Sequence, residues 1–142
     1  MKKPIKMKLR IGSKSDSGLG VFVDKRGVKS QINSDTNSKM YTKELHRGDK
    51  YCLIIRGKVD GMSDGTIVET KNRTKYLFNE LRDYERVQLE CYMFLTGFNN
   101  ALLTEHYNNE SNCINYTHDE GFWITCVDKI IQFIDTHIAT FI

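Results

Sequence analysis

Two apolar segments joined by a short turn dominate the first half of the chain. Residues 50–61, KYCLIIRGKVDG, and residues 66–71, TIVETK, are rich in β-branched and apolar side chains, and MSDG separates them. Asp-Gly is a preferred pair for a type I′ turn between antiparallel strands. The pattern therefore predicts a β-hairpin whose turn is centred on Asp64 and Gly65.

The second half of the chain changes to helical periodicity. From Tyr76 to about Leu95, apolar and amide side chains recur at spacings of three and four, and Gly97 follows as a stop signal. Residues 101–107, ALLTEHY, predict another strand, and residues 119–142 predict a closing apolar helix. These elements together predict an α/β or α+β fold, in which helices cover a mixed sheet.

Residues 13–26, SKSDSGLGVFVDKR, fit two structures. A helix would carry Leu19, Phe22 and Val23 on one side and end at Gly27. A hairpin would instead join VFV to VKSQI through DKRG. We expect the helix, with the hairpin as the alternative. The polar segment that follows, residues 33–39, predicts a loop or an exposed hairpin connection.

Length and composition add limits to this picture. A chain of 142 residues with 39% hydrophobic and 27% charged residues is expected to form one soluble domain, residues 1–142. It contains no apolar run of about 18 residues that could span a membrane, and the basic start lacks the apolar core of a secretory signal. The four cysteines form no CxxC pair. We therefore expect an intracellular protein, with a viral origin left open.

The hairpin would gather charged groups on one face of its sheet. Asp60 is expected opposite Glu69, and Lys71 points to the same face with Lys58 beside it. Two carboxylates this close repel each other, and Lys71 compensates only in part. A Mg²⁺ ion would compensate for the rest, with the Thr70 carbonyl as a further ligand. The alternative is a set of solvated surface charges.

Such a site would suit phosphodiester hydrolysis. A metal ion polarises the phosphoryl group, and Lys71 would orient the attacking water or stabilise developing negative charge. The net charge of +3 permits an anionic partner. Four basic side chains near the turn are candidates for phosphate contacts. Lys58 lies before the turn, and the other three follow it: Arg73, Lys75 and Arg82.

These residues also resemble a known family. Asp60, followed by Glu69-Thr70-Lys71, resembles the bipartite signature of the PD-(D/E)XK nucleases. In RVQLECYMFL, Gln88 and Tyr92 match the Q-x-x-x-Y motif of the RecB-like and lambda-exonuclease-like branch, which includes mitochondrial and large-DNA-virus exonucleases. The resemblance covers about residues 50–107.

The resemblance implies a restriction-endonuclease-like αβββαβ core and a nuclease dependent on Mg²⁺ or Mn²⁺, an exonuclease that hydrolyses DNA in recombination, repair or replication. It implies that Asp60 and Glu69 bind metal and that Lys71 is the catalytic lysine. Gln88 and Tyr92 would shape the active site and the DNA path.

The chain departs from the family pattern upstream of the hairpin. This branch usually has a Glu or His on its first helix, and the nearest match here is Asp16, with Asp24 behind it. Asp is shorter than Glu, so we expect Asp16 as a further metal ligand with a shorter reach. A weakly active or inactive nucleic-acid-binding module, or an RNA-directed endonuclease on the same fold, are the alternative functions.

Overall fold

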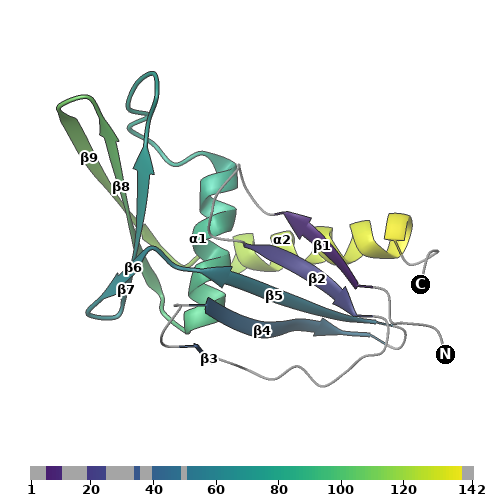
Figure 1. The fold of residues 1–142 in the computed structure, drawn as a ribbon. Coiled ribbons are helices and arrows are strands. Elements are labelled where there is room, and N and C mark those ends of the chain that lie inside the picture. The colour runs from purple at the N-terminus through teal and green to yellow at the C-terminus, as the bar shows by residue number, and fades with distance from the viewer. Residues whose placement is uncertain (1–5, 11–18, 25–33, 36–39, 49–50, 139–142) are drawn as a thin grey trace.

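The first sheet contains five antiparallel strands in the order β1-β2-β5-β4-β3 (Figure 1). The computed structural model of the protein describes residues 6–10, 19–24, 34–35, 40–48 and 51–138. Within these ranges the strands of the first sheet are β1 (Lys6–Arg10), β2 (Gly20–Asp24), β3 (Ser34–Asp35), β4 (Met40–Arg47) and β5 (Cys52–Lys58).

The second sheet contains four strands in the order β6-β7-β8-β9. Its strands are β6 (Gly61–Ser63), β7 (Thr66–Asn72), β8 (Asn100–Tyr107) and β9 (Glu110–Thr117). The pairs β6–β7 and β8–β9 are antiparallel hairpins, whereas β7 and β8 are parallel. A parallel pair needs a crossover connection, and the helix α1 (Asp83–Thr96) supplies it.

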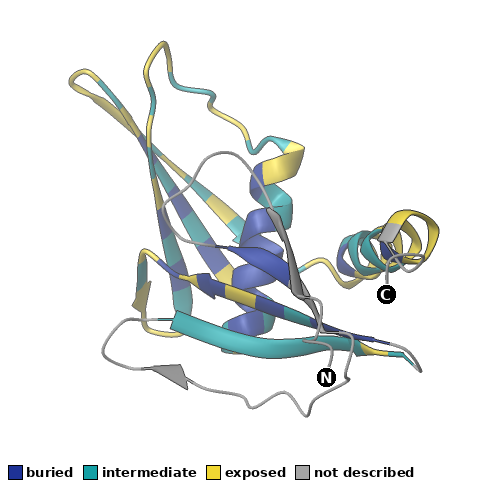
Figure 2. Ribbon diagram, turned by 45° about the vertical axis from the view of Figure 1, so that its right-hand side comes forward, coloured by how far each residue is buried: buried dark blue, intermediate teal, exposed yellow. Residues whose placement is uncertain are grey.

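Helix α1 packs against strands of both sheets, β4 and β5 of the first and β7 and β8 of the second. Figure 2 shows it as the more deeply buried of the two α-helices. It begins where the Arg82 N–H donates to the Glu85 carboxylate at 3.1 Å. It ends at Gly97, which adopts φ of 81° and donates its N–H to the Met93 carbonyl at 2.8 Å. Glycine suits this left-handed position, so the predicted stop is confirmed.

Helix α2 (Glu120–Phe133) closes the described chain and continues as the π-helical turn η1 (Ile134–Ile138). Its first turn is capped by the Asp119 carboxylate, which accepts the Phe122 N–H at 3.0 Å. Trp123 packs into the core around α1, and Ile134 is fully buried with Val21 and Leu53 of the first sheet. None of the helices in the described part of the chain is long and apolar enough to cross a membrane.

The predicted turn and its register are confirmed, but the hairpin is shorter than expected. Among the described residues before the turn, only residues 61–63 pair with β7, whereas residues 52–58 of the expected first strand form β5 and pair with β2 and β4. Lys58, at the end of β5, therefore lies in the first sheet and not on the hairpin. Met62 pairs with Ile67 and Gly61 with Val68. Asp64 and Gly65 have φ of 51° and 75°, and two positive φ values are what a type I′ turn requires. The chain enters this hairpin from the first sheet, passing between β5 and β6 through the short link 59–60.

Other predictions need correction. The helix over 13–26 is wrong where the chain is described, because residues 20–24 form β2 and pair with β1 on one side and β5 on the other. Asp24 ends that strand, while Asp16 and the VKSQI segment lie outside the described residues. The periodic helix begins at Asp83 rather than Tyr76. Strands β1, β3, β4 and β9 were not predicted. The mixed α/β class is confirmed.

Close packing between β5 and the start of β2 makes a test of this arrangement. A Cβ atom at Gly57 would lie 2.7 Å from Leu19 Cδ1 and 3.4 Å from its Cα and Cβ. Leu19 is buried, so it can move aside only by disturbing the core. We expect Gly57→Ala to lower the free energy of unfolding by about 1–3 kcal/mol in urea denaturation.

Gly121→Ala is the matched control for this change. The nearest atom to its new Cβ would be Asp119 Oδ1 at 3.6 Å, an ordinary contact. Alanine also favours a helix more than glycine does, so this variant should be as stable as the wild type or more so. Wild-type stability for Gly57→Ala would contradict the packing described between Leu19 and β5.

Candidate functional site

The Asp60 carboxylate lies where the chain leaves the first sheet for the second. Asp60 is exposed, and its Oδ2 accepts the Thr70 N–H from β7 at 2.9 Å. Asp60 precedes the paired residues of the hairpin, which begin at Gly61. The bond to Thr70 nevertheless holds the Asp60 carboxylate near that of Glu69, whose pKa its charge affects. Val59, the residue before it, is buried in the core around α1, which anchors the link on its other side.

The Glu69 carboxylate is buried and incompletely paired. The residue is 3% exposed, and no hydrogen-bond donor among the described residues reaches its Oε2. Its Oε1 lies 3.6 Å from Lys71 Nζ. Burial, together with the negative charge of Asp60, raises the Glu69 pKa from 4.5 to about 8, although Lys71 opposes this shift. Lys71 alone therefore does not stabilise both carboxylates in their ionised forms, and Glu69 keeps its proton to a higher pH than an ordinary glutamate.

Lys71 is held between the hairpin and α1. Its ammonium donates to Gln88 Oε1 at 2.8 Å, and Gln88 Nε2 donates to the Tyr92 hydroxyl at 3.4 Å. Gln88 and Tyr92 are both buried and lie one turn apart on α1, so they face β7 together. The structure thus joins four of the predicted site residues, Glu69, Lys71, Gln88 and Tyr92, into one polar chain.

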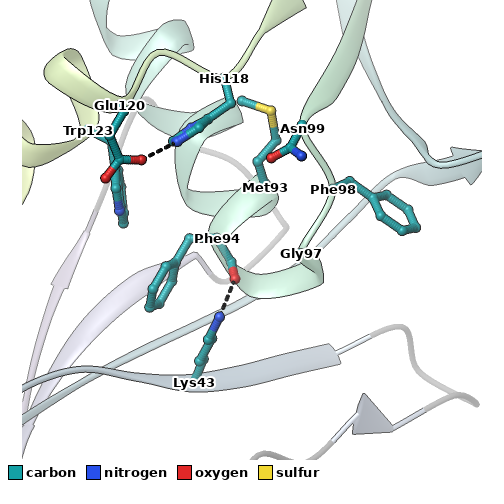
Figure 3. A pocket seen from close by; sticks show the side chains of 9 residues that line it. All are labelled: Lys43, Met93, Phe94, Gly97, Phe98, Asn99, His118, Glu120 and Trp123. Atoms are coloured by element: carbon teal, nitrogen blue, oxygen red, sulfur yellow. Dashed lines mark hydrogen bonds and ion pairs between the residues drawn. The ribbon is translucent and has the colours of Figure 1, made fainter.

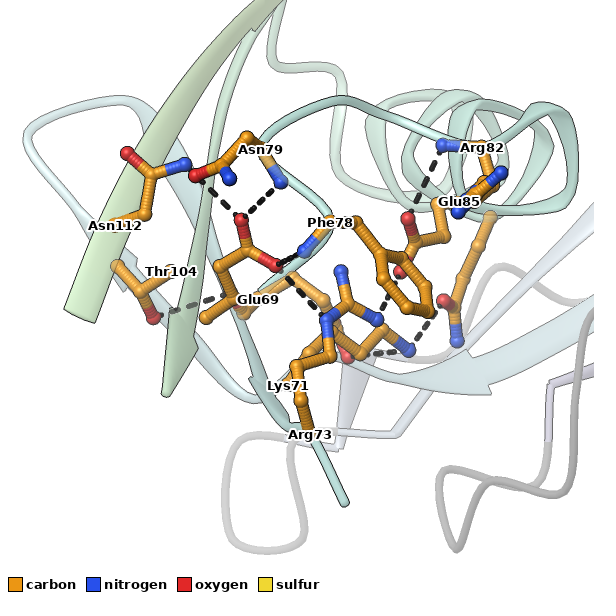
Figure 4. A network of polar contacts seen from close by, with 11 residues as sticks. Glu69, Lys71, Arg73, Phe78, Asn79, Arg82, Glu85, Thr104 and Asn112 are labelled. Atoms are coloured by element: carbon orange, nitrogen blue, oxygen red, sulfur yellow. Dashed lines mark hydrogen bonds and ion pairs between the residues drawn. The ribbon is translucent and has the colours of Figure 1, made fainter. Parts of the chain in front are cut away.

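Arg73 lies two residues beyond Lys71 and enters a second network (Figure 4). Its guanidinium pairs with Glu85 of α1 at 2.8 Å and with Glu105 of β8 at 2.9 Å. The arginine side chain is 8% exposed and both carboxylates are fully buried. The expected phosphate contact at Arg73 is corrected by this placement, because its charge already balances two buried carboxylates.

Glu105 organises the loop between β7 and α1. It accepts the N–H groups of Phe78 and Asn79, each at 2.8 Å, and the Asn112 side-chain amide at 3.0 Å. Burial raises its pKa, but these hydrogen bonds and Arg73 outweigh burial and lower the pKa to about 2. This anchoring explains why the helix starts at Asp83: the preceding backbone bonds to a carboxylate of β8 instead of continuing a helix.

Sequence reasoning missed the roles of Glu85, Glu105 and Asn112. The signal that connects Glu105 with the site is the parallel register of β7 and β8, which pairs Lys71 with Glu105. A further buried carboxylate, Glu90 of α1, was missed in the same way. It accepts the Tyr116 hydroxyl at 2.6 Å and the Asp119 N–H at 2.9 Å.

The remaining predicted site residues lie either on the surface or outside the described part of the chain. Lys58 and Lys75 are exposed, and the Arg82 side chain is 40% exposed, so all three are open to solvent. Thr70 is exposed on β7. Asp16, the predicted first-helix acid, lies outside the described residues. Within the described part of the chain, no cluster of three His, Cys, Asp or Glu residues forms a metal site.

The residues of the hairpin nonetheless suit a hard divalent cation. The unpartnered Glu69 Oε2 and the neighbouring Asp60 carboxylate are oxygen ligands, and Mg²⁺ commonly takes one or two carboxylates while keeping several waters. A cation there would bring the Glu69 pKa back toward its ordinary value. These carboxylates, with the Thr70 carbonyl, are the groups that would hold it.

A separate cavity of about 320 Å³ lies near the end of α1 (Figure 3). Nine residues line it: Lys43, Met93, Phe94, Gly97, Phe98, Asn99, His118, Glu120 and Trp123. Lys43 donates to the Phe94 carbonyl at 3.1 Å. His118 bridges Glu120 at 2.6 Å and Glu90 at 2.5 Å, and these carboxylates raise its pKa. Both cationic groups of the cavity are thus already paired.

The raised Glu69 pKa has a consequence for stability. Between pH 4.5 and about 8 the folded protein keeps a proton that the unfolded chain has lost, so stability falls as pH rises through this window. Glu69→Gln has no carboxyl to ionise. In urea denaturation with EDTA, we expect this variant to gain stability relative to the wild type as pH rises from about 4.5 to about 8.

Glu110→Gln, which changes an exposed carboxylate of β9, is the control and should follow the wild type at every pH. Parallel pH profiles for Glu69→Gln and the wild type would show that Glu69 ionises normally when folded.

The Arg73 network gives a second prediction. Arg73→Met removes the cation between two buried carboxylates, and breaking a buried pair in this way costs about 3–5 kcal/mol. Arg47→Met, which removes the partly exposed pair with Glu44, should cost less than about 1 kcal/mol. Urea denaturation near neutral pH measures both. Equal losses in the two variants would contradict the buried network.

Comparison with known proteins supports the fold. No protein-family model and no curated protein matches the chain. Among solved structures it is similar to one described as the crystal structure of SSO0001, with a TM-score of 0.53 and 16% sequence identity. The likeness covers 70% of this chain and 52% of the other, so the chain spans about half the length of that relative. At this identity the likeness concerns the fold alone, and it agrees with a mixed α/β architecture.

Proposed function

We propose that the chain is a metal-dependent deoxyribonuclease, an exonuclease of the PD-(D/E)XK type, acting in recombination, repair or replication. The proposal includes a restriction-endonuclease-like core, in which the carboxylate hairpin, α1 and β8 form its central part. The hairpin register and the parallel β7–β8 pair support this assignment. So does the link from Lys71 to Gln88, since the family signature and the Q-x-x-x-Y motif meet there.

The observation that carries the proposal is the state of Glu69. A buried carboxylate with an unpartnered oxygen, placed beside a second carboxylate, is unfavourable in the protein alone. Strongly perturbed acids of this kind gather at functional sites. A Mg²⁺ or Mn²⁺ ion held by Asp60 and Glu69 would give the Glu69 Oε2 atom a partner and would favour the ionised form of Glu69.

Each residue then has a defined task. Asp60 and Glu69 would hold a divalent ion, which when bound would supply Lewis-acid chemistry at the scissile phosphate. Lys71, positioned by Gln88, orients the attacking water or stabilises the charge that develops on the phosphate oxygens. Tyr92 holds Gln88 in place through its hydroxyl. The polar chain along α1 keeps the Lys71 ammonium beside the Glu69 carboxylate.

The substrate follows from the charges around the hairpin. Lys58, Lys75 and Arg82 are open to solvent near the ends of β5 and α1, and such side chains bind phosphates without reading sequence. The Q-x-x-x-Y motif favours DNA over RNA by resemblance.

Digestion of end-labelled linear DNA tests the proposal. Single- and double-stranded DNA are incubated with the wild type, Lys71→Ala or Lys129→Ala, in Mg²⁺, Mn²⁺ or EDTA. Lys129 is an exposed lysine of α2, so its loss matches the change of charge away from the site. We expect metal-dependent cleavage by the wild type and Lys129→Ala, and a loss of about a hundredfold or more in Lys71→Ala.

Other outcomes point to specific alternatives. Equal cleavage by Lys71→Ala and the wild type would place the activity elsewhere. DNA binding without cleavage would favour the inactive binding module, and cleavage of labelled RNA alone would favour the RNA endonuclease. Mn²⁺ should also raise the melting temperature of the wild type and not that of Glu69→Gln, which tests the metal site without relying on activity.

A further inference from the structure

The loop between β7 and α1 presents an exposed aromatic ring close to the candidate site. Tyr76 is 54% exposed, the largest exposed fraction among the large hydrophobic side chains of the described chain. Its ring centroid lies 5.5 Å from that of Phe78, with the ring planes inclined at 54°. These two rings, with Arg73 and Arg82 beside them, are called the aromatic platform below.

Phe78 forms a fixed base for this platform. Arg73 and Arg82 place their guanidinium carbons 3.7 and 4.5 Å from its ring centroid. The Phe78 N–H is held by the buried Glu105 carboxylate. The two guanidinium groups restrict the Phe78 ring, and the bond to Glu105 restricts the Phe78 backbone. Tyr76 therefore packs against a ring whose position is fixed.

The surroundings of Tyr76 indicate the chemistry of a partner. Lys75 is exposed, and the Arg82 side chain is 40% exposed, with its guanidinium 4.5 Å from the Phe78 ring centroid and 3.6 Å from the Glu80 carboxylate. The loop therefore presents an exposed aromatic ring together with two exposed cations, one of which is paired with Glu80. A partner that suits both features has a flat apolar face and a negatively charged backbone. Proteins that bind single-stranded nucleic acid combine aromatic side chains and basic groups in this way.

We propose that Tyr76 stacks on an unpaired base of single-stranded DNA that leads into the carboxylate hairpin. This inference rests on the proposed nuclease function and adds a substrate form to it. In a duplex interior the faces of each base are covered by its neighbours, so an exposed ring can stack only on a base that has left the stack. The platform therefore selects single strands and DNA ends over the interior of a duplex.

The position of Tyr76 along the chain suits this role. It follows Lys71 by five residues, so the two Cα atoms are separated by no more than about 18 Å. Nucleotides of one strand are spaced by about 3.4 Å in B-form DNA. A base on Tyr76 would thus lie within a few nucleotides of a phosphate at the hairpin.

Binding without cleavage gives the direct test. The wild type and its variants are mixed with single-stranded or double-stranded closed DNA circles of the same sequence, in EDTA, and binding is measured by filter retention. We expect Tyr76→Ala to weaken binding to the single-stranded circle on the order of tenfold, and to leave binding to the double-stranded circle little changed.

Two further substitutions separate stacking from other effects. Tyr76→Phe keeps an aromatic face and should bind single strands like the wild type. Tyr76→Leu keeps apolar surface without a π face and should lose as much as Tyr76→Ala. Phe133→Ala removes an aromatic ring that is 46% exposed at the end of α2, and it should bind both circles like the wild type.

The inference is overturned if Tyr76→Ala weakens binding to both circles equally, if Tyr76→Leu binds single strands as well as the wild type, or if no variant changes binding. Mn²⁺-dependent cleavage of linear DNA, assayed in parallel, keeps the two proposals apart. A protein that cleaves through Lys71 but binds single strands equally with or without Tyr76 loses the platform alone. A wild type that neither binds nor cleaves DNA loses both proposals.

Discussion

The position of α1 against the second sheet depends on pairing the polar side chains that the helix buries. Three of its side chains, Glu85, Gln88 and Glu90, are almost completely removed from solvent, and each requires a partner. Glu85 is paired with Arg73, and Gln88 accepts from Lys71. Glu90 accepts from groups at the end of β9 and the start of α2. The helix is thus tied along its length to three different positions, which fixes its rotation against the second sheet.

Two buried glutamates on neighbouring strands of that sheet, Glu69 and Glu105, differ in their hydrogen-bond partners and in the direction of their pKa shifts. Glu105 has four hydrogen-bond donors and a pKa lowered to about 2. Glu69 is similarly buried, yet its pKa is raised to about 8, and one of its oxygens has no partner among the described residues. Hydrogen bonds and an arginine thus stabilise the ionised form of Glu105, whereas the neighbours of Glu69 do not stabilise its ionised form to the same extent. Such a contrast is expected where a carboxylate is kept available for a ligand.

Local signals accounted for the parts of the fold that short-range chemistry determines. Asp64-Gly65 defined the hairpin and its register, and Gly97 defined the end of α1. Strand β9 was missed because its sequence, ESNCINYT, is polar and its side chains are half-buried at best. The Asn108-Asn109 pair before it was the available signal, since Tyr107 pairs with Glu110 across a two-residue turn.

The sequence motif identified residues that lie together at the hairpin, but it did not predict which neighbouring side chains are buried and paired. Glu69, Lys71, Gln88 and Tyr92 were chosen by motif, and hydrogen bonds and an ion pair join them. Arg73 was misjudged because its partners lie on α1 and β8, far from it in sequence. No property of the segment KNRTK distinguishes a buried arginine from the exposed Lys75 nearby. The difference arises from tertiary pairing, which a linear pattern does not contain.

The two-residue turn at Asp64-Gly65 also limits how the chain can change over evolutionary time. Strand β7 is held in register by seven pairs with β8, whereas β6 has three pairs with β7. One extra residue in the turn would therefore shift β6 against β7 and displace Asp60 from Glu69. Substitutions at the exposed residues Met62 and Ser63 leave this register intact. We therefore expect homologues of this chain to tolerate substitutions at exposed positions of the hairpin but not insertions or deletions in its turn. The length of the turn should be more strongly conserved than its sequence.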